Sequence, residues 1–150
     1  MKVIKYIAVL MLLVMMAYVA DGHAFFGFGK FKSVDGDNGV VSIAVSDVSD
    51  GKAHYFKYEK AGREVKFFLL KSSDNVIRAA FDACDVCFRE KKGYSQDGEF
   101  MVCNNCNMRF HSSRINEVKG GCNPSPLTRV YDDKTVSIKE SDIFAGSRYF

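Results

Sequence analysis

Two Cys-x2-Cys pairs, placed close together in a short chain, restrict the folds open to this sequence more than any other feature. Cys84 and Cys87 form the first pair, and Cys103 and Cys106 form the second, fifteen residues further on. Two cysteines separated by two residues can turn both sulfurs toward one centre, and two such turns supply four thiolates for a tetrahedral site. The spacing therefore predicts a metal site, but zinc, a single iron ion or a four-cysteine iron–sulfur cluster all fit it.

Residues 1–24 have the layout of a secretory signal peptide. Lys2 and Lys5 make a positive start, residues 7–20 are an unbroken apolar run, and small residues follow it. An uncleaved membrane anchor is the alternative, although a spanning helix needs about 20 apolar residues. No twin-arginine pair precedes the apolar run, which indicates Sec-type export and metal loading after export. We expect an extracytoplasmic protein of the periplasm or cell envelope, associated with the membrane through its N-terminus if the segment stays attached.

A fifth cysteine, Cys122, follows two glycines and is followed by two nearby prolines. Because glycines let the backbone approach a ligand closely, we interpret Cys122 as a fifth ligand or an exchangeable thiol rather than a buried free cysteine. Met108, His111 and His54 are candidate additional ligands, since thioether, imidazole and thiolate together suit copper. Each also has a simpler interpretation: Met108 as a packing residue, His111 as a surface residue and His54 as a histidine packed on a strand face.

Disulfide bonds are the main alternative to metal, because an exported chain enters an oxidising compartment. Four cysteines could pair and leave Cys122 over, but an odd number argues against a purely structural disulfide framework. A redox-active Cys-x2-Cys disulfide would suit a thiol-exchange enzyme, yet no thioredoxin-like βαβ pattern surrounds either pair. Nothing singles out Cys122 and His111 as a nucleophile and its base. We therefore predict no catalytic residue and favour a metal-binding protein over an enzyme.

Alternating apolar residues predict a mainly β domain, a small α+β fold arranged as a compact β-meander or sandwich. Residues 64–70 alternate most clearly, and the pattern groups Phe68 with Glu64 and Lys66 on the face opposite the other apolar residues. Residues 143–150 are expected to pack or pair at the end of the chain. The predicted strands are 40–45, 53–58, 64–70, 76–81 and 135–138.

Residues 82–127 differ from the β segments, because they are polar and contain few long apolar side chains. A segment with so poor a core of its own needs metal or disulfides, so we predict a zinc-ribbon-like metal lobe with cysteine knuckles. This lobe lies within a predicted metal-binding domain, residues 39–150, and a flexible aromatic and glycine-rich linker, residues 25–38, precedes that domain. Asp82 and Asp85 flank the first cysteine, either as acceptors near the site or as solvated acids.

Length and charge exclude two broad classes of function. With 150 residues, the chain is long enough for one small domain and too short for an enzyme with a separate cofactor domain. Its formal net charge of +3 comes from lysines and arginines scattered among acidic residues, which gives no electrostatic footprint for nucleic acid. Nucleic acid is therefore not an expected partner.

Five short motifs around the cysteines carry a resemblance to a known family. They are residues 80–87 (AFDACDVC), 92–94 (KGY), 102–106 (VCNNC), 115–116 (IN) and 120–127 (GGCNPSPL). With these motifs, the chain from about residue 39 to its end resembles the C-terminal domain of FtrD-like membrane iron–sulfur proteins. The resemblance implies iron or an iron–sulfur cluster as the cofactor, and an iron-uptake permease or a membrane redox protein as the partner.

The same resemblance implies a role in electron transfer or metal handling during iron uptake. The metal-ligand positions that it implies are Cys84, Cys87, Cys103, Cys106 and Cys122. Two other hypotheses stay open for the same cysteines, namely a structural-zinc module that binds a partner protein and a Cu(I)-handling protein that also uses Met108 and His111. A disulfide-exchange enzyme without metal is a further alternative.

Overall fold

Three small β-sheets make up the described part of this protein. The computed structural model describes residues 29–150, so the predicted signal or anchor segment, residues 1–24, lies outside the described residues. The strands are β1 (Phe31–Val34), β2 (Val40–Ala44), β3 (His54–Lys60), β4 (Arg63–Lys71), β5 (Ile77–Phe81), β6 (Tyr94–Asp97), β7 (Phe100–Cys103), β8 (Arg109–His111), β9 (Val130–Tyr131) and β10 (Thr135–Lys139). The helical segments are α2 (Glu140–Ala145) and the 3₁₀ turns η1 (Val45–Val48), η2 (Phe88–Glu90), η3 (Ser112–Arg114) and η4 (Gly146–Tyr149). This architecture confirms the predicted fold class, a mainly β domain with a cysteine-rich lobe.

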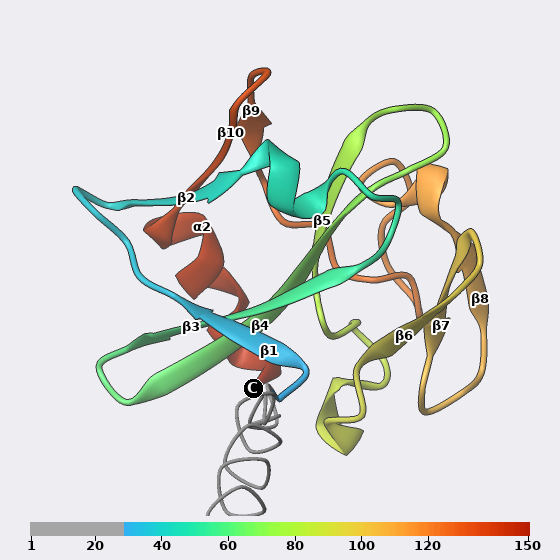
Figure 1. The fold of residues 1–150 in the computed structure, drawn as a ribbon. Coiled ribbons are helices and arrows are strands. Elements are labelled where there is room, and N and C mark those ends of the chain that lie inside the picture. The colour runs from blue at the N-terminus through green and yellow to red at the C-terminus, as the bar shows by residue number, and fades with distance from the viewer. Residues whose placement is uncertain (1–28) are drawn as a thin grey trace, which may run out of the picture.

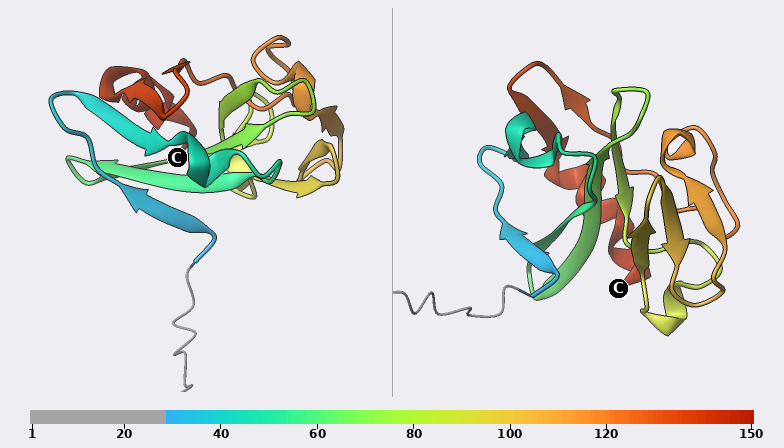
Figure 2. Two further views of the ribbon diagram at one scale, coloured as in Figure 1. Left: turned by 45° about the horizontal axis from the view of Figure 1, so that its top comes forward. Right: turned by 45° about the vertical axis from the view of Figure 1, so that its right-hand side comes forward.

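The central layer is a four-stranded sheet with the order β1-β3-β4-β5. The sheet β2-β10-β9 and helix α2 cover one of its faces, and the sheet β6-β7-β8 lies on the other side (Figures 1 and 2). Neighbouring strands are antiparallel except for β1 and β3, which run parallel. The sheet β6-β7-β8 forms the framework of the cysteine lobe.

Strand β4 is buried on both faces, and this burial places the lobe. Phe67 and Leu69 point into the main core, which β2, β10 and α2 complete. Phe68 points the other way, into a second core that includes Cys84 and Cys103. The sequence pattern groups Phe68 with polar residues, yet its side chain is fully buried, because the lobe rather than water covers that face.

Of the two terminal segments, the N-terminal one differs from its prediction and the C-terminal one agrees with it. Residues 31–34 belong to the predicted linker, residues 25–38, but they form β1 and pair with β3, so this part of the linker is a strand. The first four residues of that linker lie outside the described part of the chain. Residues 143–150 do pack on the core, as helix α2 and the 3₁₀ turn η4, and they bury Ile143 and Tyr149.

Candidate metal centre

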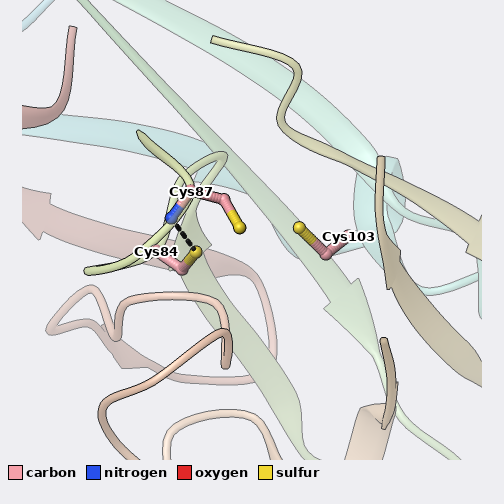
Figure 3. A group of neighbouring side chains, drawn as sticks. All are labelled: Cys84, Cys87 and Cys103. Carbon is pink, nitrogen blue, oxygen red and sulfur yellow. Dashed lines mark hydrogen bonds between the residues drawn. The ribbon is translucent and has the colours of Figure 1, made fainter. Parts of the chain in front are cut away.

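The first Cys-x2-Cys pair forms a tight turn after β5. The backbone N–H of Cys87 donates to Cys84 Sγ at 3.2 Å, which is the dashed line in Figure 3. The turn η2 follows, and it ends at Lys91, whose backbone is left-handed with φ +53°. In Figure 3 the sulfurs of Cys87 and Cys103 point toward one another, so this local turn presents its thiols to the end of β7.

The second pair forms the turn between β7 and β8. The Asn107 N–H donates to the Cys103 carbonyl at 2.8 Å, and the Cys103 N–H donates to the Met108 carbonyl at 3.0 Å. Asn107 has φ +60°, a conformation that asparagine adopts more readily than most residues. This turn holds Cys103 buried at the end of β7 and leaves Cys106 exposed within the loop.

Cys122 reaches the same place because the segment after it runs along β5. Ser125 exchanges backbone hydrogen bonds with Phe81 and Ala83, at 2.8 and 2.9 Å. The Tyr94 hydroxyl, from β6, donates to the Cys122 carbonyl at 2.6 Å. These contacts bring the Cys122 sulfur to 3.8 Å from the sulfur of Cys87.

The five sulfurs form two groups of three that share Cys87. The inner triad is Cys84, Cys87 and Cys103, drawn in Figure 3, and the outer triad is Cys87, Cys106 and Cys122. Within each triad, the sulfurs all lie within 4.8 Å of one another. A tetrahedral ion bound at about 2.3 Å from each thiolate sets its sulfurs about 3.8 Å apart, so each triad is close enough to hold an ion after small side-chain movements.

The grouping of the sulfurs differs from the one that the spacing suggests. The sequence predicts that both Cys-x2-Cys pairs hold one ion together, with Cys122 completing the site. In the structure, Cys106 is instead grouped with Cys122 and the shared Cys87. All five cysteines are free thiols in the described chain, and their role as metal ligands stays a prediction.

The two candidate histidine ligands of residues 29–150 lie outside the triads. His54 Nε2 contacts Asp50 Oδ1 at 2.7 Å, and His111 Nδ1 contacts Ser113 Oγ at 2.8 Å. The Met108 side chain is exposed. The structure therefore does not bring these two histidines to the cysteines.

Burial raises the pKa of the cysteine thiols, whereas hydrogen bonds from backbone N–H groups lower it. Burial raises the pKa of the Cys103 thiol to about 11, against the N–H groups of Cys106 and Asn105, which favour the thiolate. The N–H of Met108 lowers the pKa of the exposed Cys106 thiol. Because a metal ion binds the thiolate and releases the proton, these donors support the anionic sulfurs once a cation is present.

The buried carboxylate of Asp82, paired with the exposed Lys30, connects the lobe to the central sheet. The Asp82 side chain is 4% exposed and accepts hydrogen bonds from the Tyr94 N–H at 2.7 Å and from Lys30 Nζ at 3.0 Å. Burial raises the pKa of Asp82, whereas Lys30 and the Tyr94 N–H lower it. Asp85, in contrast, is half exposed and accepts from the Tyr149 hydroxyl at 2.7 Å. Asp82 is therefore an acceptor close to the site and Asp85 a partly solvated acid, as the two sequence interpretations allow.

Sequence reasoning missed Lys30 and Tyr94 as residues that support the site. Lys30 donates to the Tyr94 carbonyl at 2.7 Å as well as to Asp82, although 52 residues separate Lys30 from that acid. Tyr94 is buried and joins Asp82 to the Cys122 carbonyl. The Gly93-Tyr94 pair within the KGY motif is the available sequence signal, because a glycine marks a close approach of the backbone.

The replacement Gly93→Ala is expected to loosen this connection. A Cβ at Gly93 would lie 2.3 Å from Asp82 Oδ2, and the residue has φ +62°. The positive φ costs about 1–2 kcal/mol for alanine, and crowding a buried neighbour costs about 1–3 kcal/mol more. The control is Gly98→Ala, where φ is +57° and nothing lies within 4 Å, so that only the conformational cost applies. Chemical denaturation measures both variants, and equal losses of stability would contradict a tight Gly93–Asp82 contact.

A cleft of about 440 Å³ opens beside the inner triad. Its lining includes all three inner-triad cysteines but neither Cys106 nor Cys122. Lys30, Lys91 and Lys92 add basic side chains to the same cleft. The two triads therefore face different surroundings, the inner one next to this basic cleft and the outer one next to the exposed loop of Cys106.

Comparison with known proteins identifies the family. A family model described as "Membrane iron-sulfur containing protein FtrD-like" matches residues 48–150, which include all five cysteines. The chain belongs to the FtrD-like family. No curated protein and no solved structure matches it. Within residues 29–150 of this FtrD-like chain, no helix is long and apolar enough to span a membrane.

Proposed function

We propose that the FtrD-like chain holds iron through its five cysteine thiolates and serves electron transfer or metal handling in an iron-uptake system. The observation that carries the proposal is the gathering of the five sulfurs into triads whose members lie within 4.8 Å of one another. Thiolate sulfur is a ligand that iron, zinc and Cu(I) share, and the family description names an iron–sulfur protein. These two facts together favour iron over the other two metals.

The chain's own residues prepare the sulfurs for a bound ion. The N–H of Cys87 donates to Cys84 Sγ, and N–H groups on the second turn support the sulfurs of Cys103 and Cys106. Such N–H···S hydrogen bonds and the degree of solvent exposure set the potential of a thiolate-bound iron, which supplies a one-electron couple when present. Cys106 is exposed, so a redox partner can approach one edge of the site closely.

The proposed setting is the periplasm or cell envelope. Its support is the signal-like pattern of residues 1–24 and the family description as a membrane protein. The proposed partner is an iron-uptake permease or a membrane redox protein, as the family resemblance implies. No nucleic acid is proposed, because the net charge of +3 gives no basic footprint.

Metal content and redox behaviour test this function directly. Protein isolated anaerobically from its native envelope is expected to contain iron by elemental mass spectrometry and to show a reversible one-electron change in a potentiometric titration. Cys103→Ser is expected to lose iron and colour together, because it removes a buried thiolate. Met108→Leu is the control and is expected to keep both, since its side chain is exposed and the proposed iron site uses only thiolates.

Other outcomes of that measurement separate the alternatives. Zinc as the only metal, in colourless protein, would overturn the electron-transfer proposal and favour a structural module that binds a partner. Copper that is lost in Met108→Leu would indicate Cu(I) handling instead. Oxidised cysteines without metal, together with thiol-dependent reductase activity, would support the disulfide-exchange alternative.

A further inference from the structure

We infer that the cysteine centre binds two metal ions, one in each triad, and that the Cys87 thiolate bridges them. This inference rests on the proposed metal-binding function and adds the number of ions and the role of each cysteine. It applies to divalent metals that thiolates bind, namely iron and zinc.

The geometry favours two positions over one. A single four-coordinate ion needs four sulfurs close to one another, and no four cysteine sulfurs of residues 29–150 lie within 4.8 Å of one another. The sulfurs instead divide into two triads, and Cys87 belongs to both. Cys87 Sγ lies 3.8 Å from Cys122 Sγ in the outer triad, the separation expected for two thiolates on one ion. A thiolate keeps more than one lone pair after binding one ion, so a single sulfur can bind a second ion as well.

Charge is compatible with two ions. Metal binding releases the thiol protons, and five thiolates in a partly buried cluster repel one another and carry a large desolvation cost. Two divalent ions offset four of these five negative charges. Each triad supplies three protein ligands and leaves a fourth position open, as metal sites that exchange ligands do.

The two positions differ in access. Cys84 and Cys103 of the inner triad are 1% and 2% exposed, and both belong to the second core around Phe68. In the outer triad, Cys106 is exposed and Cys122 is half buried. The inner ion is therefore held by side chains of the second core, beside the cleft of about 440 Å³, whereas the outer ion is held in part by the exposed loop of Cys106.

Titration of the metal-free full chain with Co²⁺ tests this assignment, because thiolate-bound Co²⁺ absorbs strongly and is paramagnetic. The wild type is expected to bind two equivalents, and its paramagnetic resonance signal is expected to fall as the second equivalent couples to the first through a bridging sulfur. Cys84→Ser and Cys122→Ser are each expected to bind one equivalent and to keep that signal. Met108→Leu is the control and is expected to behave as the wild type.

Each remaining outcome overturns a stated part of the inference. Saturation of the wild type at one equivalent overturns the second ion but leaves the proposed metal-binding function intact. Two equivalents without a fall in the resonance signal overturn the bridge by Cys87. No Co²⁺ binding overturns both the inference and the proposed function. The wild-type titration decides these points even if Cys84→Ser, a change in the second core, fails to fold.

Discussion

Removing the metal is expected to speed amide hydrogen exchange across β6, β7 and β8 by about 100- to 1,000-fold, while β3, β4 and β5 stay protected. A ligand present at about 100 to 1,000 times its Kd stabilises the state that binds it by this factor. We expect the lobe to depend on this contribution, because two of its core residues, Cys84 and Cys103, are themselves inner-triad residues. The central sheet has the main core on its other face and does not share this dependence. Hydrogen exchange measured by mass spectrometry with and without chelator follows each strand separately.

Two cysteine variants refine that experiment. Cys103→Ser removes a buried inner-triad thiol and is expected to show the fast exchange even in the presence of metal. Cys106→Ser removes an exposed thiol of the outer triad and is expected to keep most of the protection. Unchanged exchange in the chelated wild type would show that packing alone holds the lobe.

Phe68→Ala is expected to lower the free energy of unfolding by about 3–5 kcal/mol, the usual cost of emptying a buried phenylalanine site. Phe68 is fully buried, and its ring lies 6.3 Å from the ring of Tyr94 and 5.8 Å from that of Tyr55. Because Phe68 packs under the cysteine lobe, the same change is expected to weaken metal binding by about 10- to 100-fold. Chemical denaturation and competition with a coloured chelator measure the two effects.

Phe67→Ala is the matched control for that prediction. Phe67 is the neighbouring residue on β4, is equally buried and has the same size, but it faces the main core. It is expected to lose a similar amount of stability and to keep the metal affinity of the wild type. An equal loss of affinity in both variants would attribute the effect to general destabilisation rather than to support of the lobe.

Local patterns account for the parts of the fold that were predicted well. Strands β2, β3, β4, β5 and β10 lie within about two residues of their predicted limits, because apolar and β-branched runs between turn residues mark strands. The three strands of the lobe were not predicted, since each has only three or four residues and two of them, β6 and β8, are mostly polar. Strand β1 was not predicted for another reason. Its pairing with β3 joins segments more than twenty residues apart.

The sequence by itself determined the candidate ligand atom, which is cysteine sulfur, and the protein family. Each Cys-x2-Cys turn is local, so spacing alone predicts two turns that each present thiols, and the motifs around them indicate the FtrD-like family that the family model confirms. Only the tertiary structure decided which sulfurs meet. Cys122 joins Cys87 and Cys106 because Ser125 pairs with β5, and the inner triad forms because Phe68 and the Lys30–Asp82 pair hold the lobe on the central sheet. Such contacts join residues far apart in the chain, and they depend on how whole sheets pack rather than on any local pattern.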